Sequence, residues 1–161
     1  MQNRAIILAI FLISIILDQL TKYIVQTRLA LYQSITILEN FFHITYILNK
    51  GAAFGVLSNR SESFRTPFFI IISILAIAGL IYFYIVYAKN SKLNQIAIAL
   101  ILSGAVGNLI DRIALGVVRD FIDVHWYNIH WPAFNIADTS ISIGTGLLIL
   151  GLYLEDKKEK S

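Results

Sequence analysis

Asp120 and Asp138 are the two residues of this chain whose type and placement best suit catalysis. Asp138 lies near the start of a long apolar segment, where the dipole of a helix would favour its ionised form, and Asp120 lies in the loop before it. Two carboxylates that lie close together do not both ionise easily, so one keeps a proton while the other accepts one. Such a pair can activate a water molecule and protonate a substrate. The nearby cation without an expected partner is Arg119, which as a loop residue is expected to face water or phosphate.

Further polar residues gather at the ends of three apolar segments. Their spacing of i, i+3, i+4 or i, i+3, i+7 puts each set on one face of a helix. The sets are Asp18, Thr21 and Lys22; Asn108, Asp111 and Arg112; and Asn135, Asp138 and Ser142. Consecutive helices run in opposite directions, so these three ends are expected to meet at one level of a bundle. A structural alternative is equally compatible with the pattern, in which Asp18 pairs with Lys22 and Asp111 with Arg112 as clamps.

The composition indicates an integral membrane protein. Of the 161 residues, 57% are hydrophobic and only 14% are charged, against about 45–50% and about 25% in a soluble domain. The chain has no cysteine, which excludes a disulfide framework, a thiol nucleophile and a cysteine-bound metal. Its net charge of +3 is too small to indicate a nucleic-acid partner. The length predicts a single membrane-embedded domain over residues 1–161.

Four segments are long and apolar enough to cross a bilayer as helices, which takes about 20 residues. They cover approximately residues 5–25, 67–87, 93–113 and 133–154. Pro67 suits the first position of the second helix, because its missing N–H costs nothing there. No small-x-small cleavage site follows the first segment, so we expect a retained span rather than a cleaved signal peptide. Lysine and arginine are densest in the short segments that hold both termini, which predicts that both termini are cytoplasmic.

The longer connecting segments are then expected on the outer side of the membrane. Residues 33–38 and 42–48 alternate polar and apolar side chains, which predicts a hairpin or small sheet within an outer β-region at about 33–57. The polar stretch 58–63 is expected to begin a short surface helix, and the aromatic-rich loop 114–132 to lie along the membrane surface. The predicted fold is an all-α integral membrane protein with four transmembrane helices, a small extracytoplasmic β-sheet and a short surface helix.

Five blocks of the sequence resemble the signature blocks of bacterial lipoprotein signal peptidase (signal peptidase II), in that family's order. They are Asp18-Gln19-Leu20-Thr21-Lys22, Asn49-Lys50-Gly51-Ala52-Ala53-Phe54-Gly55, Gly104-Ala105-Val106-Gly107-Asn108-Leu109-Ile110-Asp111-Arg112, Val118-Arg119-Asp120-Phe121 and Phe134-Asn135-Ile136-Ala137-Asp138. Each block is a weak pattern alone, but together, with four spans and this length, they are specific. Ser103 is a departure, because the family often has a further glycine there.

The resemblance implies an intramembrane aspartic endopeptidase that removes signal peptides from prolipoproteins by cutting before a diacylglyceryl-modified cysteine. It implies that Asp120 and Asp138 are the catalytic pair. Residues that would support the pair are Asn108, Asp111, Arg112 and Asn135, and residues that would bind substrate are Asn49, Gly51, Asp18 and Lys22. Arg112 would hold Asp111 or contact the substrate backbone.

The resemblance also implies a setting for the enzyme. We expect a monomer in the bacterial cytoplasmic (inner) membrane, in contact with membrane lipid and with its active site near the outer face. We expect inhibition by globomycin-type peptides and no need for a metal or other cofactor.

Three alternatives can be set against the peptidase. The histidines His43, His125 and His130 suggest a metal site, but the i, i+5 spacing of the last two is not a helical ligand spacing, and no carboxylate is expected to join all three. A small transporter would also place carboxylates in the membrane, but across its whole depth. A non-catalytic scaffold predicts that Asp120→Asn and Asp138→Asn have no effect. The clustering of charge at one depth favours the peptidase.

Overall fold

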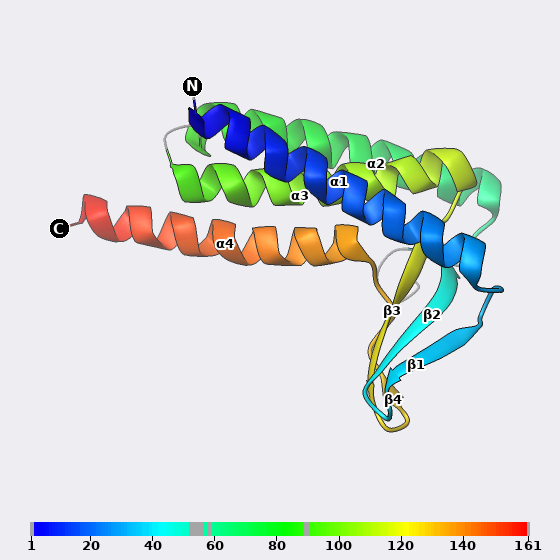
Figure 1. Cartoon of the computed structure of the whole chain (residues 1–161). Coiled ribbons are helices and arrows are strands. Elements are labelled where there is room, and N and C mark those ends of the chain that lie inside the picture. Colours follow the sequence, from blue (N-terminus) through cyan, green and yellow to red (C-terminus); the bar gives the residue numbers. More distant parts are fainter. Residues whose placement is uncertain (1, 52–56, 58, 89–90, 161) are drawn as a thin grey trace.

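The computed structural model describes residues 2–51, 57, 59–88 and 91–160. The elements follow in the order α1 (Gln2–Arg28), β1 (Ser34–Leu38), β2 (Phe42–Asn49), α2 (Glu62–Phe83), the π-helical turn η2 (Tyr84–Ala88), α3 (Lys92–Leu115), β3 (Val118–Trp126), β4 (Ile129–His130) and α4 (Ile136–Glu159). The long helices α1, α2, α3 and α4 lie side by side, with the sheet projecting from one end of the bundle and both termini at the other (Figure 1).

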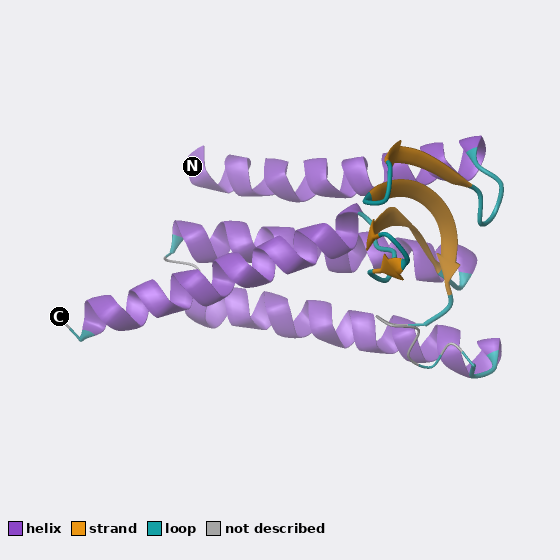
Figure 2. Cartoon of the chain, turned by 90° about the horizontal axis from the view of Figure 1, so that it is seen from below, coloured by secondary structure: helices purple, strands orange, loops and turns teal. Residues whose placement is uncertain are grey.

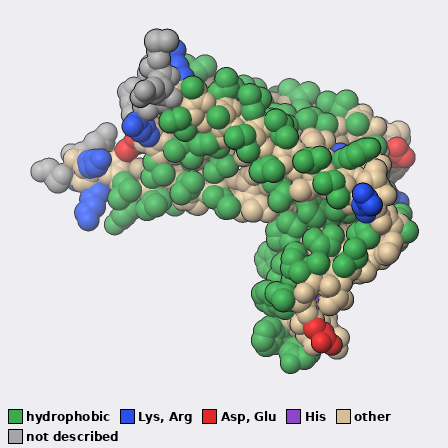
Figure 3. All heavy atoms as spheres, viewed as in Figure 1, with side chains coloured by type: hydrophobic (Ala, Val, Ile, Leu, Met, Phe, Trp, Pro, Cys, Tyr) green, Lys and Arg blue, Asp and Glu red, His purple; other side chains and the backbone are tan. Residues whose placement is uncertain are grey.

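Among the described residues, four helices are long and apolar enough to cross a membrane, over residues 4–28, 62–88, 92–115 and 136–158. The four predicted spans are therefore confirmed as helices. Figure 3 shows that hydrophobic side chains cover the flank of the bundle. Large apolar residues of the helices, such as Ile16, Leu75 and Ile149, are exposed. A surface of this size and character suits lipid rather than water. The protein is a multi-pass membrane protein.

The second helix begins earlier than expected, at Glu62 rather than at Pro67. Ser61 precedes the first turn, and the acidic side chain of Glu62 suits the positive end of the helix dipole. Pro67 therefore lies inside α2, where its missing N–H removes one bond of the second turn. In the stretch 58–63, where a surface helix was expected to begin, residues 59–61 are not helical and residues 62 and 63 belong to α2; Ser58 lies outside the described residues.

The third helix is the centre of the bundle, because α3 packs against each of the other three helices. Its approach to α4 depends on glycine. A side-chain carbon at Gly104 would collide with the carbonyl oxygen of Ala137, and one at Gly144 would collide with the backbone of Ala97. Small residues at such crossings let two helix backbones approach closely. The start of α4, which carries Asp138, is thereby held directly against α3.

The four strands form one antiparallel sheet in the order β1-β2-β3-β4. The hairpin of β1 and β2 agrees with prediction, and Asn40 in its turn adopts the left-handed backbone conformation (φ 57°) that asparagine tolerates. Residues 114–132 do not form a surface loop, because β3 pairs with β2 and β4 with β3. The fold is therefore not all-α, because the sheet has four strands and includes β3 and β4. The strand β3 could not be predicted from alternating polar and apolar side chains, because polar residues on it, including Arg119 and Asp120, are buried.

The sheet is fixed to the bundle by a small apolar cluster. Val25 and Leu29 near the end of α1 pack with Tyr46 of β2 and Phe121 of β3. Figure 2 shows the curved strands lying across one end of the helices. The strand β3 also contacts α3. This docking brings the residues at the start of β3 to the ends of α1 and α3, where the polar sets predicted from the sequence lie.

Candidate active site

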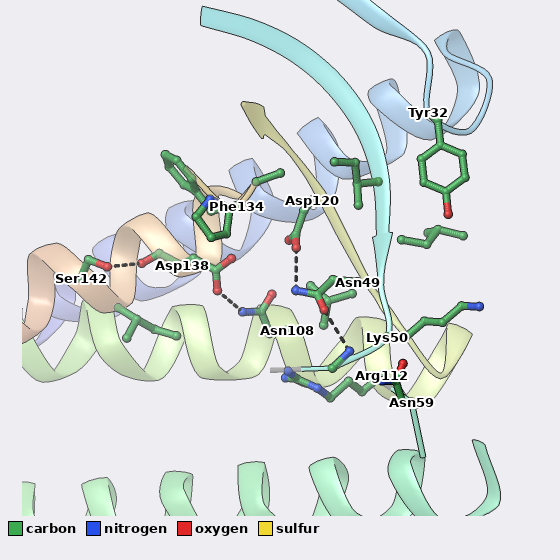
Figure 4. A pocket seen from close by; sticks show the side chains of 17 residues that line it. Tyr32, Asn49, Lys50, Asn59, Asn108, Arg112, Asp120, Phe134, Asp138 and Ser142 are labelled. Atoms are coloured by element: carbon green, nitrogen blue, oxygen red, sulfur yellow. Dashed lines mark hydrogen bonds between the residues drawn. The ribbon is translucent and has the colours of Figure 1, made fainter. Parts of the chain in front are cut away.

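A cavity of about 870 Å³ opens where the sheet meets the helices. Its walls come from the end of β2, the start of β3, the C-terminal part of α3 and the start of α4 (Figure 4). The lining includes six of the site residues that the resemblance implied, namely Asn49, Gly51, Asn108, Arg112, Asp120 and Asp138. Tyr32, Lys50, Asn59, Phe134 and Ser142 also line it. The rest of the glycine-rich block, residues 52–55, lies outside the described residues.

Asp138 is held at the first turn of α4 by a reciprocal capping arrangement with Asn135. The Asn135 side-chain oxygen accepts a hydrogen bond from the Asp138 backbone N–H (2.9 Å), and Asp138 Oδ2 accepts one from the Asn135 backbone N–H (3.3 Å). Asp138 Oδ1 accepts a bond from Asn108 Nδ2 at 2.8 Å. The helix N-terminus therefore positions this carboxylate and favours its negative charge.

Asp120 reaches the same cavity from β3 and is only 2% exposed. Its Oδ1 accepts a hydrogen bond from Asn135 Nδ2 (2.7 Å), and its Oδ2 accepts one from Asn49 Nδ2 (3.0 Å). In Figure 4 a dashed line joins Asp120 to the amide of Asn49, and another joins Asp138 to the amide of Asn108. Asn135 bonds to both aspartates, so three neutral amides orient the pair. Within the described ranges, neither aspartate forms an ion pair.

Burial, followed by the charge of Asp138, raises the pKa of Asp120 to about 7. A buried carboxylate loses solvation, and a neighbouring like charge disfavours ionisation further, so the neutral acid is preferred. One member of the pair can therefore hold a proton near neutral pH. A proton held by the pair in this way is what acid–base chemistry by two carboxylates requires.

This pKa predicts a pH dependence of stability. The folded state binds a proton at Asp120 that the unfolded chain, with an ordinary carboxyl pKa of about 3.9, has already lost. Stability should therefore fall as the pH rises from about 4 to about 7. Asp120→Asn should lack this fall, which thermal unfolding of both proteins over that pH range will measure. Parallel pH curves for wild type and variant would contradict the raised pKa.

Behind the pair lies a buried cluster of ion pairs. Lys22 Nζ lies 2.9 Å from Asp18 Oδ2 and 3.5 Å from Asp111 Oδ2, and Arg119 Nη2 lies 2.7 Å from Asp111 Oδ1. The expected Asp18–Lys22 pair is confirmed. The expected Asp111–Arg112 pair is wrong, because β3 lays Arg119 along Asp111 and the Arg119 backbone N–H and Nε both donate to Asp111 Oδ2.

Arg119 accordingly faces neither water nor phosphate. It is 9% exposed, and hydrogen bonding to Asp111 raises the pKa of its guanidinium above the usual value. A planar guanidinium that donates several bonds to one carboxylate is a strongly oriented pair. Arg112, in contrast, lines the cavity, and its guanidinium carbon lies 5.2 Å from the centre of the Phe69 ring. Its expected role of holding Asp111 is therefore taken by Arg119 and Lys22.

The buried ion pairs contact the surroundings of Asp138 in two ways, through the Asn108 side chain and through the backbone of α4. Lys22 Nζ donates to Asn108 Oδ1 at 3.0 Å, which leaves the Asn108 NH₂ group facing Asp138. Asp18 Oδ1 accepts from the backbone N–H of Ala137, the residue before Asp138, at 2.9 Å. Asp18 and Lys22 are fully buried and do not line the cavity, so this geometry gives them no direct contact with a substrate.

Two glutamines belong to the cluster and were not predicted. Gln19 donates from Nε2 to Asp111 (3.2 Å) and accepts from Arg119 Nη2 (3.1 Å), while Gln26 accepts from Arg119 Nη1 (2.8 Å). Their sequence signal is an i, i+7 pair of amides on one face of a mainly apolar helix. Such amides are costly to bury unless they are hydrogen-bonded, so their spacing points to a polar partner.

The histidines also depart from expectation. His43 of β2 and His125 of β3 lie beside Asp123, and His130 Nδ1 lies 2.8 Å from Asp123 Oδ1. A carboxylate therefore does join all three histidines, which the sequence did not predict because the pairing of β2, β3 and β4 was unknown. None of these four residues lines the cavity that holds Asp120 and Asp138.

Comparison with known proteins identifies the family of this chain. The family model described as signal peptidase (SPase) II matches residues 10–154. The chain belongs to the signal peptidase II family. It is 47% identical over 145 residues to the lipoprotein signal peptidase of Syntrophotalea carbinolica, covering 90% of this chain and 89% of the relative. It is 42% identical to that of Staphylococcus aureus over 160 residues, covering 98% and 94%.

Solved structures resemble this member of the signal peptidase II family over nearly its whole length. A bacterial membrane enzyme solved by the in meso method at 2.3 Å resolution is 40% identical and superposes with a TM-score of 0.86, covering 98% of this chain and 92% of the other. A second such enzyme, at 1.9 Å resolution, is 37% identical with a TM-score of 0.82 and covers 92% of each chain. The family membership suggested by the five sequence blocks is confirmed.

Proposed function

We propose that this protein is an intramembrane aspartic endopeptidase. It removes signal peptides from diacylglyceryl-modified prolipoproteins by cleaving just before the lipidated cysteine. The observation that carries the proposal is the arrangement of Asp120 and Asp138, two carboxylates held by neutral amides at a single cavity between sheet and bundle. The lipoprotein signal peptidases among its relatives support the substrate class.

The two aspartates take different roles in the proposed reaction. Asp138, whose negative charge is favoured at the N-terminus of α4, accepts a proton from a water molecule as the water oxygen attacks the scissile carbonyl carbon. Asp120, whose raised pKa keeps it protonated, donates its proton to the carbonyl oxygen. In the second step Asp138 returns its proton to the leaving amide nitrogen, Asp120 takes one back from a hydroxyl, and the C–N bond breaks.

The remaining site residues position these groups or the substrate. Asn49, Asn108 and Asn135 orient the two carboxylates by hydrogen bonds. Gly51 borders the cavity, and its backbone N–H donates to Asn49 Oδ1 at 2.9 Å, which fixes that amide. Arg112 lies at the cavity wall, where it contacts the substrate backbone. It does not act as the acid, because the pKa of a guanidinium is too high for proton transfer.

Asp18, Lys22 and Asp111 act through their neighbours rather than through the substrate. Their buried charges fix Asn108, the start of α4 and the start of β3 relative to one another. We therefore assign these three residues a positioning role, in place of the substrate contact that the resemblance implied for Asp18 and Lys22.

Cleavage of a defined substrate tests the proposed function. Purified protein in detergent should shorten a prolipoprotein that carries the diacylglyceryl group and leave the unlipidated precursor intact, and a gel shift measures both. A globomycin-type cyclic peptide should inhibit in a dose-dependent manner. A folded protein that cleaves neither substrate would refute the peptidase assignment, and cleavage of both equally would refute the lipid requirement.

We further propose that the protein is a monomer in the bacterial inner membrane, with both termini cytoplasmic and the sheet and cavity near the outer face. The basic residues Lys157, Lys158 and Lys160 at the end of α4 support this orientation, because cytoplasmic segments are enriched in lysine and arginine. The proposal also places the aromatic residues Trp126, Tyr127 and Trp131 at the outer interface, where such rings are favoured.

The absence of cysteine makes the orientation simple to test by labelling. Glu39 lies in the exposed turn between β1 and β2, and Asp156 lies exposed near the end of α4. In intact spheroplasts, Glu39→Cys should react with a membrane-impermeant maleimide, whereas Asp156→Cys should react only after the membrane is opened. The opposite pattern of labelling would invert the topology.

A further inference from the structure

All three histidines of the chain gather with one aspartate on a single face of the sheet, away from the catalytic cavity. His43 of β2 pairs directly with Asp123 of β3, and His125 pairs with His130 of β4. Since Asp123 and His125 are two residues apart on β3, all four side chains project to the same face. One coordinating atom from each of His43, Asp123 and His125 lies within 4.8 Å of the others.

A second observation points to a missing partner in this cluster. His125 is 5% exposed, and its Nδ1 atom has no hydrogen-bond partner among the described residues. The same atom lies 3.9 Å from Asp123 Oδ1, too far for a hydrogen bond. An unsatisfied buried polar atom is costly. A cation placed between the nitrogen and the carboxylate would satisfy both.

Hydrogen bonds from neighbouring side chains already orient the Asp123 carboxylate, as is usual for metal ligands. Thr45 Oγ1 donates to Asp123 Oδ2 at 3.2 Å, and the Thr45 and Ser34 hydroxyls lie 2.8 Å apart. His130 Nδ1 lies 2.8 Å from Asp123 Oδ1, and its ring stacks on His125 with centroids 4.5 Å apart. Outer hydrogen bonds of this kind fix the direction of coordinating groups and strengthen metal binding.

We propose that His43, Asp123 and His125 bind a divalent transition-metal ion of the zinc class, with His130 holding the carboxylate. Imidazole nitrogens and a carboxylate are ligands that zinc prefers, whereas magnesium and calcium prefer oxygen alone. Zinc–nitrogen bonds of about 2.0–2.1 Å put tetrahedral ligand atoms about 3.4 Å apart. Small side-chain rotations therefore close the cluster around the ion, and the bound metal ties β2 to β3.

The ion has no part in the proposed cleavage. Asp120 precedes Asp123 by three residues on β3, so the two side chains project to opposite faces of the strand and lie about 10 Å apart along it. Chelation should therefore lower thermal stability but leave cleavage of the lipidated substrate intact. Loss of cleavage that zinc restores would overturn this separation, because it would place the metal at the catalytic pair.

The zinc content of the purified protein tests the proposal directly. Full-length protein purified without a histidine tag is stripped with a chelator, re-equilibrated with zinc, desalted and analysed by mass spectrometry. Wild type should hold about one zinc ion per chain. His43→Gln and Asp123→Asn each remove a coordinating atom, so they should bind zinc at least about 100-fold more weakly, the upper end of the loss seen when only a supporting hydrogen bond is removed. His130→Gln should show a smaller loss of about 10-fold or more. Asp156→Asn, an exposed carboxylate change, should match wild type.

Two further measurements keep the proposal falsifiable if a variant fails to fold. Cobalt bound to wild-type protein should give the visible absorption bands of a tetrahedral site, and their absence would overturn the proposal without any variant. Zinc should also raise the melting temperature of wild type but not of His43→Gln. Equal zinc content in wild type and folded His43→Gln, or loss of zinc in Asp120→Asn, would overturn the assignment.

Discussion

Replacement of either Asp120 or Asp138 by asparagine should lower cleavage of a lipidated prolipoprotein by at least about 10³-fold. Asparagine keeps the size of the side chain but neither accepts nor releases the proton that the proposed reaction moves. The loss should appear in kcat, because both groups act on the reacting atoms. Single-turnover cleavage with saturating substrate, followed on a gel, measures it.

Both variants should remain folded, which separates a chemical effect from a structural one. The existing partners of the pair are amides, and an asparagine can bond to an amide as either donor or acceptor after rotation of its side chain. A cooperative unfolding transition in detergent at a temperature no lower than that of wild type, together with continued binding of an uncleaved substrate, would show this. Asp156→Asn, an exposed carboxylate distant from the cavity, is the matched control and should keep full activity. Wild-type turnover in both catalytic variants would refute the pair.

Removal of the buried lysine should have the largest effect on stability. Lys22→Met leaves Asp18 fully buried beside a neutral side chain and takes one of two cations from Asp111. Breaking a buried ion pair from one side costs about 3–5 kcal/mol, because the remaining charge is uncompensated. Thermal or chemical unfolding in the same detergent measures the difference.

The chain contains an almost exact control for that experiment. Lys160 pairs with Asp156 at the same i, i+4 spacing, but its side chain is 73% exposed, against 0% for Lys22. Lys160→Met should therefore change stability very little, since exposed ion pairs of this kind contribute almost nothing. Lys22→Met should also reduce kcat in the fraction that stays folded, because Asn108 loses the contact that orients its amide toward Asp138. Equal effects of the two substitutions would refute a special role for the buried cluster.

The helices could be predicted because each depends on the apolar character of one continuous segment of the sequence. About twenty apolar residues suffice to identify a span, so the four helices agree with expectation, and an asparagine turn between alternating residues identifies the first hairpin. The position of Pro67 was misjudged because the polar first turn of α2 extends beyond the apolar segment on which the prediction rested.

The partners of the charged residues could not be predicted in the same way. Asp111 lies next to Arg112 in sequence, but adjacent helical side chains project in different directions, and the strand β3 supplies Arg119 instead. The pairing of β2 with β3 joins segments about seventy residues apart, and only that register brings Asn49 to Asp120 and His43 to Asp123. Spacing along the chain carries no information about such a register.

The proposed catalytic aspartates belong to two parts of the molecule that form at different stages of synthesis. Asp138 lies on the last helix, whereas Asp120 lies on a strand whose partner β2 was made before the second and third helices. Insertion of the helices alone leaves the pair apart, and the pair forms only when β3 docks against β2 and the final helix is in place. A nascent or partly inserted chain is therefore inert, so proteolytic activity in the membrane is restricted to molecules that have completed assembly.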